Sequence, residues 1–190
     1  LGPHLPYAAR FWKERAILTR RALRKGNITD AYKIAHENGL TPGSLEYAEA
    51  EWLSGWISLR FLNDYRTAFL HFERMHGAVK FPISIARGAY WAGRAKEAVG
   101  EDKQAFDWYR KASENPLTYY GQLAFARLQP GKSLKFPDII EPTGAFFKEF
   151  DRHELVNVIR ILATLEEEDL VKIFLKRLIA LSKDPEWWAR

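Results

Sequence analysis

The sequence predicts an all-α fold, built as a superhelical array of α-helical hairpins without a sheet. Three observations support this prediction. Apolar residues recur at the steps of one helix face, as in Leu45, Ala48, Trp52 and Trp56. No stretch shows the sustained alternation that a half-buried strand requires. A local pattern around three alanines also returns twice at an interval of 37 residues.

Helix boundaries can be assigned in order along the chain. The first helix carries an apolar stripe, formed by Trp12, Ala16 and Leu23. Ser44 and Asp64 are expected to be N-caps, because their short side chains can accept hydrogen bonds from free backbone N–H groups. Pro82 suits the first turn of a helix, where a backbone N–H has no partner.

The repeated unit has two signature positions. An alanine followed by an aromatic residue marks the second helix of each hairpin, at Ala31, Ala68 and Ala105. Five residues earlier comes a residue type that tolerates a left-handed backbone at a helix end, namely Gly26, Asn63 and Gly100. We therefore expect tetratricopeptide-like hairpins with a period of about 37 residues, which is longer than the period of about 34 in that repeat class.

Small residues near tryptophans indicate close helix crossings. Gly55 follows Trp52 by three residues, and Gly93 follows Trp91 by two. A glycine lets a neighbouring helix approach, so we expect these glycines to lie at such crossings.

The predicted organisation has three parts. Residues 1–128 form the repeat region. Residues 129–143 contain three prolines and Gly131, a composition typical of a linker. Residues 144–190 are predicted to form a helical hairpin segment, with apolar stripes running from Leu155 to Leu165 and from Leu170 to Leu181. Acidic residues at 166–169 would complement the dipole of the second helix.

Composition excludes several classes of protein. Cysteine is absent, which removes disulfides, thiolate metal sites and cysteine nucleophiles. Charges interrupt every apolar stretch, so no membrane span is predicted. The 29 Lys and Arg against 24 Asp and Glu give a net charge of +5, a mild excess that favours anionic partners.

The sequence contains no motif that predicts a catalytic site, a cofactor site or a metal site. His71 and His76 are five residues apart, which places them about 140° apart on a helix, whereas zinc-binding histidines four apart share one face. Gly131-Lys132-Ser133 lacks the earlier glycine and the preceding strand of a phosphate-binding loop.

The first helix is strongly basic, with seven Lys or Arg between Arg10 and Lys25. Two interpretations are open: a strip that binds a polyanion, and an ordinary solvated helix face, which we favour. A nucleic-acid partner is not expected, because the aromatic residues follow the packing register and are not interleaved with the basic ones.

Two strings are similar to a known family. They are Tyr90-Trp91-Ala92-Gly93-Arg94-Ala95 and Tyr119-Tyr120-Gly121-Gln122-Leu123-Ala124. With the tryptophan-rich stretch at 51–62, they resemble the superhelical region of soluble lytic murein transglycosylases, particularly the alphaproteobacterial type. The resemblance covers residues 11–126, and 153–182 is more weakly similar to the helices that lead into the family's catalytic domain.

The resemblance implies a non-catalytic scaffold in the periplasm. The family cleaves the MurNAc-GlcNAc bond of peptidoglycan with a glutamate that stands in a Glu-Ser pair, and no Glu-Ser pair occurs in these 190 residues. This chain alone is therefore expected to be inactive, and to hold peptidoglycan for a catalytic domain that it does not contain. Possible glycan contacts are Arg87, Arg94, Tyr119 and Tyr120. The alternative is a tetratricopeptide-like adaptor that binds a protein partner.

Overall fold

The computed structural model describes residues 7–134, 148 and 150–181, and the regular elements among these residues are all helical. This confirms the all-α prediction. The chain separates into two compact units, Leu1–Lys135 and Phe136–Arg190, each considered by itself below.

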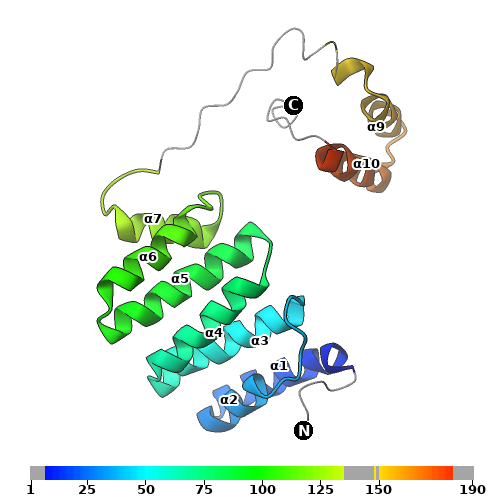
Figure 1. The fold of residues 1–190 in the computed structure, drawn as a ribbon. Helices are drawn as coiled ribbons and strands as arrows, with labels where there is room; N and C mark the ends of the chain where they lie inside the picture. The colour runs from blue at the N-terminus through cyan, green and yellow to red at the C-terminus, as the bar shows by residue number, and fades with distance from the viewer. Residues whose placement is uncertain (1–6, 135–147, 149, 182–190) are drawn as a thin grey trace. The chain divides into compact units, whose positions relative to one another are not determined.

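The first unit is a sequence of helices joined by short connections (Figure 1). Its elements are α1 (Ala8–Arg24), α2 (Ile28–His36), α3 (Leu45–Ile57), the π-helical turn η1 (Ser58–Leu62), α4 (Tyr65–Ala78), α5 (Pro82–Val99), α6 (Asp102–Ser113) and α7 (Tyr119–Leu128). Each α-helix packs against the next along the chain. Consecutive helices run in opposite directions, so that the starts of α1, α3, α5 and α7 lie along the same side of the unit (Figure 1).

The predicted left-handed turns are confirmed. The backbone is left-handed after α1 at Gly26, with a φ of 80°. It is also left-handed after η1 at Asn63, with a φ of 53°, and after α5 at Gly100, with a φ of 81°. The three alanines that follow these turns at a distance of five residues are buried: Ala31, Ala68 and Ala105. Each hairpin therefore has the local structure expected for it, with a tight turn and a small residue facing the core.

The predicted helix starts are also confirmed. The Ser44 hydroxyl accepts a hydrogen bond from the Tyr47 backbone N–H at 3.1 Å, and the Asp64 carboxylate accepts one from the Thr67 N–H at 3.1 Å. Pro82 is the first residue of α5. These contacts satisfy backbone donors that have no partner inside the helix.

Two apolar clusters fill the first unit. One lies between α1, α2 and α3 around Trp12 and Ile57, and the other extends from α3 to α7 around Phe72 and Tyr90. Trp52 and Trp56 of α3 pack against both clusters.

Glycines allow the close approach of helices at the expected positions. A Cβ atom at Gly93 would lie 2.7 Å from two ring carbons of Tyr109 and 3.2 Å from the Ala105 carbonyl oxygen. At Gly55, it would lie 2.8 Å from Cε1 of Phe72. The helices α3 and α4, and α5 and α6, therefore pack at a separation that only glycine permits at these two points.

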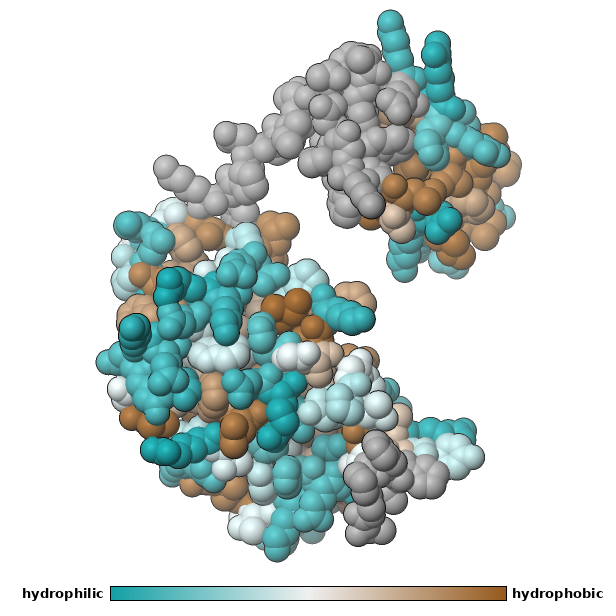
Figure 2. Space-filling view, in the orientation of Figure 1, coloured by the Kyte–Doolittle hydropathy of each residue, from teal (hydrophilic) through white to brown (hydrophobic). Residues whose placement is uncertain are grey.

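The second unit contains α9 (Glu154–Thr164) and α10 (Glu168–Leu181), which pack against each other as the predicted hairpin. Within these two helices the buried residues are Val156 and Leu178. Other members of the two apolar stripes are exposed, among them Leu165 at 63% and Ile173 at 61%. Figure 2 shows apolar side chains on the surface of this unit.

The domain boundaries stay predictions. Helix α7 ends at Leu128, the last residue of the expected repeat region. Most of the expected linker, and parts of the segment 144–190, lie outside the described residues.

The Gly93 crossing gives a test by substitution. Replacement Gly93→Ala should lower the free energy of unfolding by about 1–3 kcal/mol, because the new methyl group overlaps the Tyr109 ring. Gly77→Ala is the matched control, since a Cβ at Gly77 meets nothing within 4 Å and alanine favours a helix by up to about 1 kcal/mol. Urea denaturation of both variants checks this, and equal stability of the two would contradict the crossing.

Candidate functional site

A continuous row of aromatic side chains crosses α3, α5 and α7. We call it the aromatic row, and its members are Trp56, Trp52, Trp91, Tyr120 and Tyr119. Successive ring centroids are 6.0, 6.3, 6.4 and 5.2 Å apart. The first four rings are half-buried and Tyr119 is 69% exposed. The row therefore combines rigid ring packing with ring surface that a ligand can reach.

Arg87 lies on this row. Its guanidinium carbon is 4.5 Å from the centre of the Trp52 ring, a cation–π distance. Burial lowers the pKa of Arg87, an effect that the nearby Tyr120 and Glu49 oppose, and arginine still keeps its charge at neutral pH. Its buried Nε has no hydrogen-bond partner among the described residues, and neither do the indole nitrogens of Trp52 and Trp91. Buried N–H groups are usually paired, so these three donors are exceptions, and their burial closes them to a ligand unless the neighbouring side chains move.

Arg94 has a different environment from Arg87. It forms an ion pair with Glu97, in which Nε and Oε2 are 3.1 Å apart. Glu97 also accepts hydrogen bonds from the Tyr109 hydroxyl at 2.9 Å and from Arg127 at 2.5 Å. Arg94 thus belongs to a network that joins α5, α6 and α7.

Of the four contacts expected from the sequence, three lie along the aromatic row. Arg87 stacks on Trp52, Tyr120 lies between Tyr90 and Trp91, and Tyr119 is exposed beside Tyr120. Sequence reasoning did not link them to Trp52 and Trp56, because those residues lie on another helix and only the packing of α3 on the α4–α5 pair brings them together.

A groove between α1 and α3 lies at the Trp56 end of the aromatic row. We call it the α1–α3 groove, and it has a volume of about 520 Å³. Its lining includes Arg20, Leu23, Arg24, Trp52, Trp56 and Phe61. The basic first helix was the local signal for this groove, but its aromatic wall of Trp52, Trp56 and Phe61 comes from a later part of the chain and was not predicted.

The basic residues of α1 do not all have the same role. Arg15 donates hydrogen bonds to the carbonyl oxygens of Ile34 at 2.6 Å and Glu37 at 2.5 Å, at the end of α2. It is therefore a structural residue and not part of a free basic strip. Arg20 and Arg24 line the groove, whereas Arg21 and Lys25 are exposed outside its lining.

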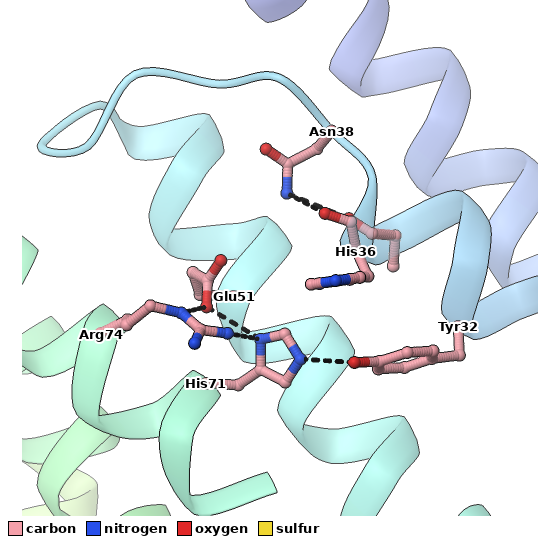
Figure 3. A network of polar contacts seen from close by, with 7 residues as sticks. Tyr32, His36, Asn38, Glu51, His71 and Arg74 are labelled. Carbon is pink, nitrogen blue, oxygen red and sulfur yellow. Dashed lines mark hydrogen bonds and ion pairs between the residues drawn. The ribbon is translucent and has the colours of Figure 1, made fainter. Parts of the chain in front are cut away.

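A buried polar network joins α2, α3 and α4 (Figure 3). Glu51 lies 2.8 Å from Nδ1 of His71 and 2.8 Å from Nε of Arg74. Nε2 of His71 lies 3.0 Å from the Tyr32 hydroxyl. The His36 ring stacks on Tyr32, with centroids 5.2 Å apart.

Protonation in this network follows from its contacts. Burial alone would raise the pKa of Glu51, but the contacts with His71 and the charged Arg74 outweigh burial and hold that pKa below its usual value of 4.5. Nδ1 of His71 also lies 2.8 Å from an Nη of Arg74. It can donate to Glu51 or accept from Arg74 but not both, so the tautomer decides whether Tyr32 donates to Nε2 or accepts from it.

The distances in the network resemble those of a catalytic relay, but a substrate has no access to it. His71 is completely buried, so a substrate cannot reach the ring. We interpret the network as structural, since each buried polar group is paired and a buried glutamate needs such partners. The sequence analysis missed Glu51 even though its spacing from Ala48 and Gly55 places it on the buried face. Its partners come from other helices and carried no local signal.

Comparisons with known proteins give no match, whether with protein-family models, with curated proteins or with solved structures. In the described part of the chain, no helix has the length and apolar character needed to cross a membrane. Within the same residues, no group of three or more acidic or histidine side chains is placed to hold a metal ion.

The pH dependence of stability tests the Glu51 network. A carboxylate with a lowered pKa stabilises the fold fully above its ordinary pKa, and this contribution is lost as the pH falls through the folded-state pKa. Replacement Glu51→Gln should lower the free energy of unfolding at pH 7 by about 1–3 kcal/mol. It should also flatten the loss of stability between about pH 5 and pH 3.

The matched control for this experiment is Glu73→Gln, on the exposed surface of α4. Chemical denaturation across this pH range should give a Glu73→Gln profile parallel to that of the unsubstituted chain. A Glu51→Gln profile that is also parallel would contradict the proposed ionisation of Glu51.

Proposed function

We propose that this chain is the non-catalytic superhelical scaffold of a soluble lytic murein transglycosylase. In this proposal its hairpins form a tetratricopeptide-like array with a period of about 37 residues. The array holds peptidoglycan in the periplasm, while a catalytic domain that is not in this chain cleaves the MurNAc-GlcNAc bond. The scaffold contributes orientation and effective concentration rather than bond chemistry.

The observation that carries the proposal is the aromatic row with Arg87. Flat aromatic faces pack against the C–H faces of sugar rings, and an arginine beside them can pair with the carboxylates of a glycopeptide. The partly exposed rings lie at intervals of about 6 Å along the row, so that an extended strand can make many weak contacts. The net charge of +5 has the sign that an anionic strand requires.

Two features favour a holding role over catalysis. The sequence has no Glu-Ser pair, and the relay-like network around His71 is closed to a substrate. The strings that resemble the family, around Trp91 and Tyr120, supply residues of the row.

Co-sedimentation with purified peptidoglycan sacculi tests this function. The chain should bind sacculi at physiological salt and release no soluble muropeptides into the supernatant. Binding should weaken at higher salt, because part of the attraction is between exposed charges. Absence of binding at physiological salt would refute the proposal.

A substitution at the exposed end of the row makes the test specific. Tyr119→Ala should weaken binding to sacculi about threefold to tenfold, because it removes a ring that is 69% exposed. Tyr7→Ala is the control, since Tyr7 is 68% exposed and lies on another helix end. Equal effects of the two substitutions would show that the row is not the binding surface.

A second candidate function, an adaptor for a protein partner, is favoured by one specific observation. Large apolar side chains are exposed at or just before the starts of α3, α5 and α7, namely Leu45, Phe81, Ile83 and Leu117. These helix starts lie along one side of the unit (Figure 1), and such exposed apolar residues are typical of protein interfaces. An adaptor should form a complex of defined stoichiometry that Phe81→Ser with Leu117→Ser abolishes and Tyr119→Ala does not.

A further inference from the structure

The α1–α3 groove has one aromatic wall and one basic wall. Trp52 and Trp56 of α3 form the first wall, with rings inclined by only 16° and centroids 6.0 Å apart. Arg20 and Arg24 of α1 are four residues apart, so they lie on the same side of the helix one turn apart. Leu23 lies between them in the sequence and gives the basic wall an apolar base.

The π-helical turn η1 completes the aromatic wall. Trp56 and Phe61 are five residues apart, and a regular α-helix would place them about 140° apart. The turn η1 (Ser58–Leu62) follows Trp56 and contains Phe61, and a π-helical turn is wider than an α-helical one because its hydrogen bonds join residues five apart. The Phe61 ring meets the Trp56 ring edge to face, at a centroid distance of 5.2 Å, and is 43% exposed.

The positive charges of the groove are not neutralised. Neither Arg20 nor Arg24 has an ion pair or a hydrogen bond with another described residue, and both are exposed. The groove thus offers two guanidinium groups beside three aromatic rings.

We propose that the α1–α3 groove binds a sugar unit that carries a carboxylate. The tryptophan faces pack against the sugar ring, and Arg20 and Arg24 pair with the carboxylate, for which the planar guanidinium fork is well suited. This inference rests on the proposed function and deepens it, since it names a binding site and the acidic sugar as the unit recognised there.

The distribution of charge favours an acidic glycan over a single-stranded nucleic acid. A nucleic acid has a phosphate at every nucleotide, and proteins that bind it provide positive charge along the whole strand. Here the two free arginines are concentrated at the groove. Arg87 lies with its guanidinium against Trp52, which also lines the groove, so this charge too is at the groove end of the aromatic row. This pattern suits a polymer in which acidic groups are widely spaced.

Two soluble disaccharides test the inference on the full 190-residue chain. One contains N-acetylglucosamine and N-acetylmuramic acid, and therefore has one carboxylate. The other is chitobiose, which has two N-acetylglucosamine units and no charge. Titration followed by the indole N–H signals of Trp52 and Trp56 in NMR spectra should show binding of the acidic disaccharide at least about tenfold tighter than that of chitobiose.

Two double variants with the same change of charge distinguish the contribution of the groove arginines to binding from the general electrostatic attraction of α1. Arg20→Gln with Arg24→Gln should weaken binding of the acidic disaccharide about tenfold and leave chitobiose binding unchanged. Arg21→Gln with Lys25→Gln changes two exposed residues outside the groove lining and should weaken binding less than about twofold. Circular dichroism of both variants should give the spectrum of the unsubstituted chain.

Three results would overturn the inference. They are equal affinity for the two disaccharides, equal losses in the two double variants, and tighter binding of oligodeoxythymidylate with the same dependence on Arg20 and Arg24. The sacculus experiment separates this inference from the proposed function. Sacculi bound equally by both double variants would refute the groove and leave the scaffold proposal standing. Binding of the acidic disaccharide without binding of sacculi would refute the scaffold proposal alone.

Discussion

The first unit depends on the packing of Trp52 and Trp56, which contact both apolar clusters. These two rings join the cluster of α1 to α3 to the cluster that extends to α7. Trp52 is also the ring over which Arg87 lies and one wall of the α1–α3 groove. A large aromatic residue can serve all these contacts because its two faces and its edge pack independently. The core and the candidate binding surface are therefore coupled through the same side chains.

Close packing around these rings requires small residues and paired charges. Gly55 and Gly93 let α4 and α6 approach their neighbours, and a single added carbon would overlap an aromatic ring at either point. The close approach of α3 and α4 also buries Glu51. Its charge is tolerated because the carboxylate is hydrogen-bonded with His71 and Arg74. The network and Gly55 are consequences of one constraint, the short distance between α3 and α4, and Gly93 answers the same constraint between α5 and α6.

The arrangement is better suited to holding a ligand than to changing it. The relay-like contacts around His71 are buried, whereas Arg20 and Arg24 are exposed and line the groove with the aromatic rings. Repeated weak contacts along the aromatic row would give a bound glycan strand its affinity, and the charged groove at the end of the row would fix the position of the strand along it. This combination is the physical basis of the scaffold proposal and of the acidic-sugar site.

The helical class, the caps at Ser44 and Asp64 and the left-handed turns could be predicted from the sequence, because each depends on residues close in the chain. The small residue at Gly93 predicted a close crossing, but not that the crossing partner is Tyr109. Tertiary structure decided which faces meet. It joined Arg87 to Trp52, paired Glu51 with His71, and left Leu165 and Ile173 exposed. It also placed the Phe61 ring, in the π-helical turn, against the Trp56 ring. Contacts between helices depend on crossing distance and register, which result from the packing of all the helices together and leave no local pattern in the sequence.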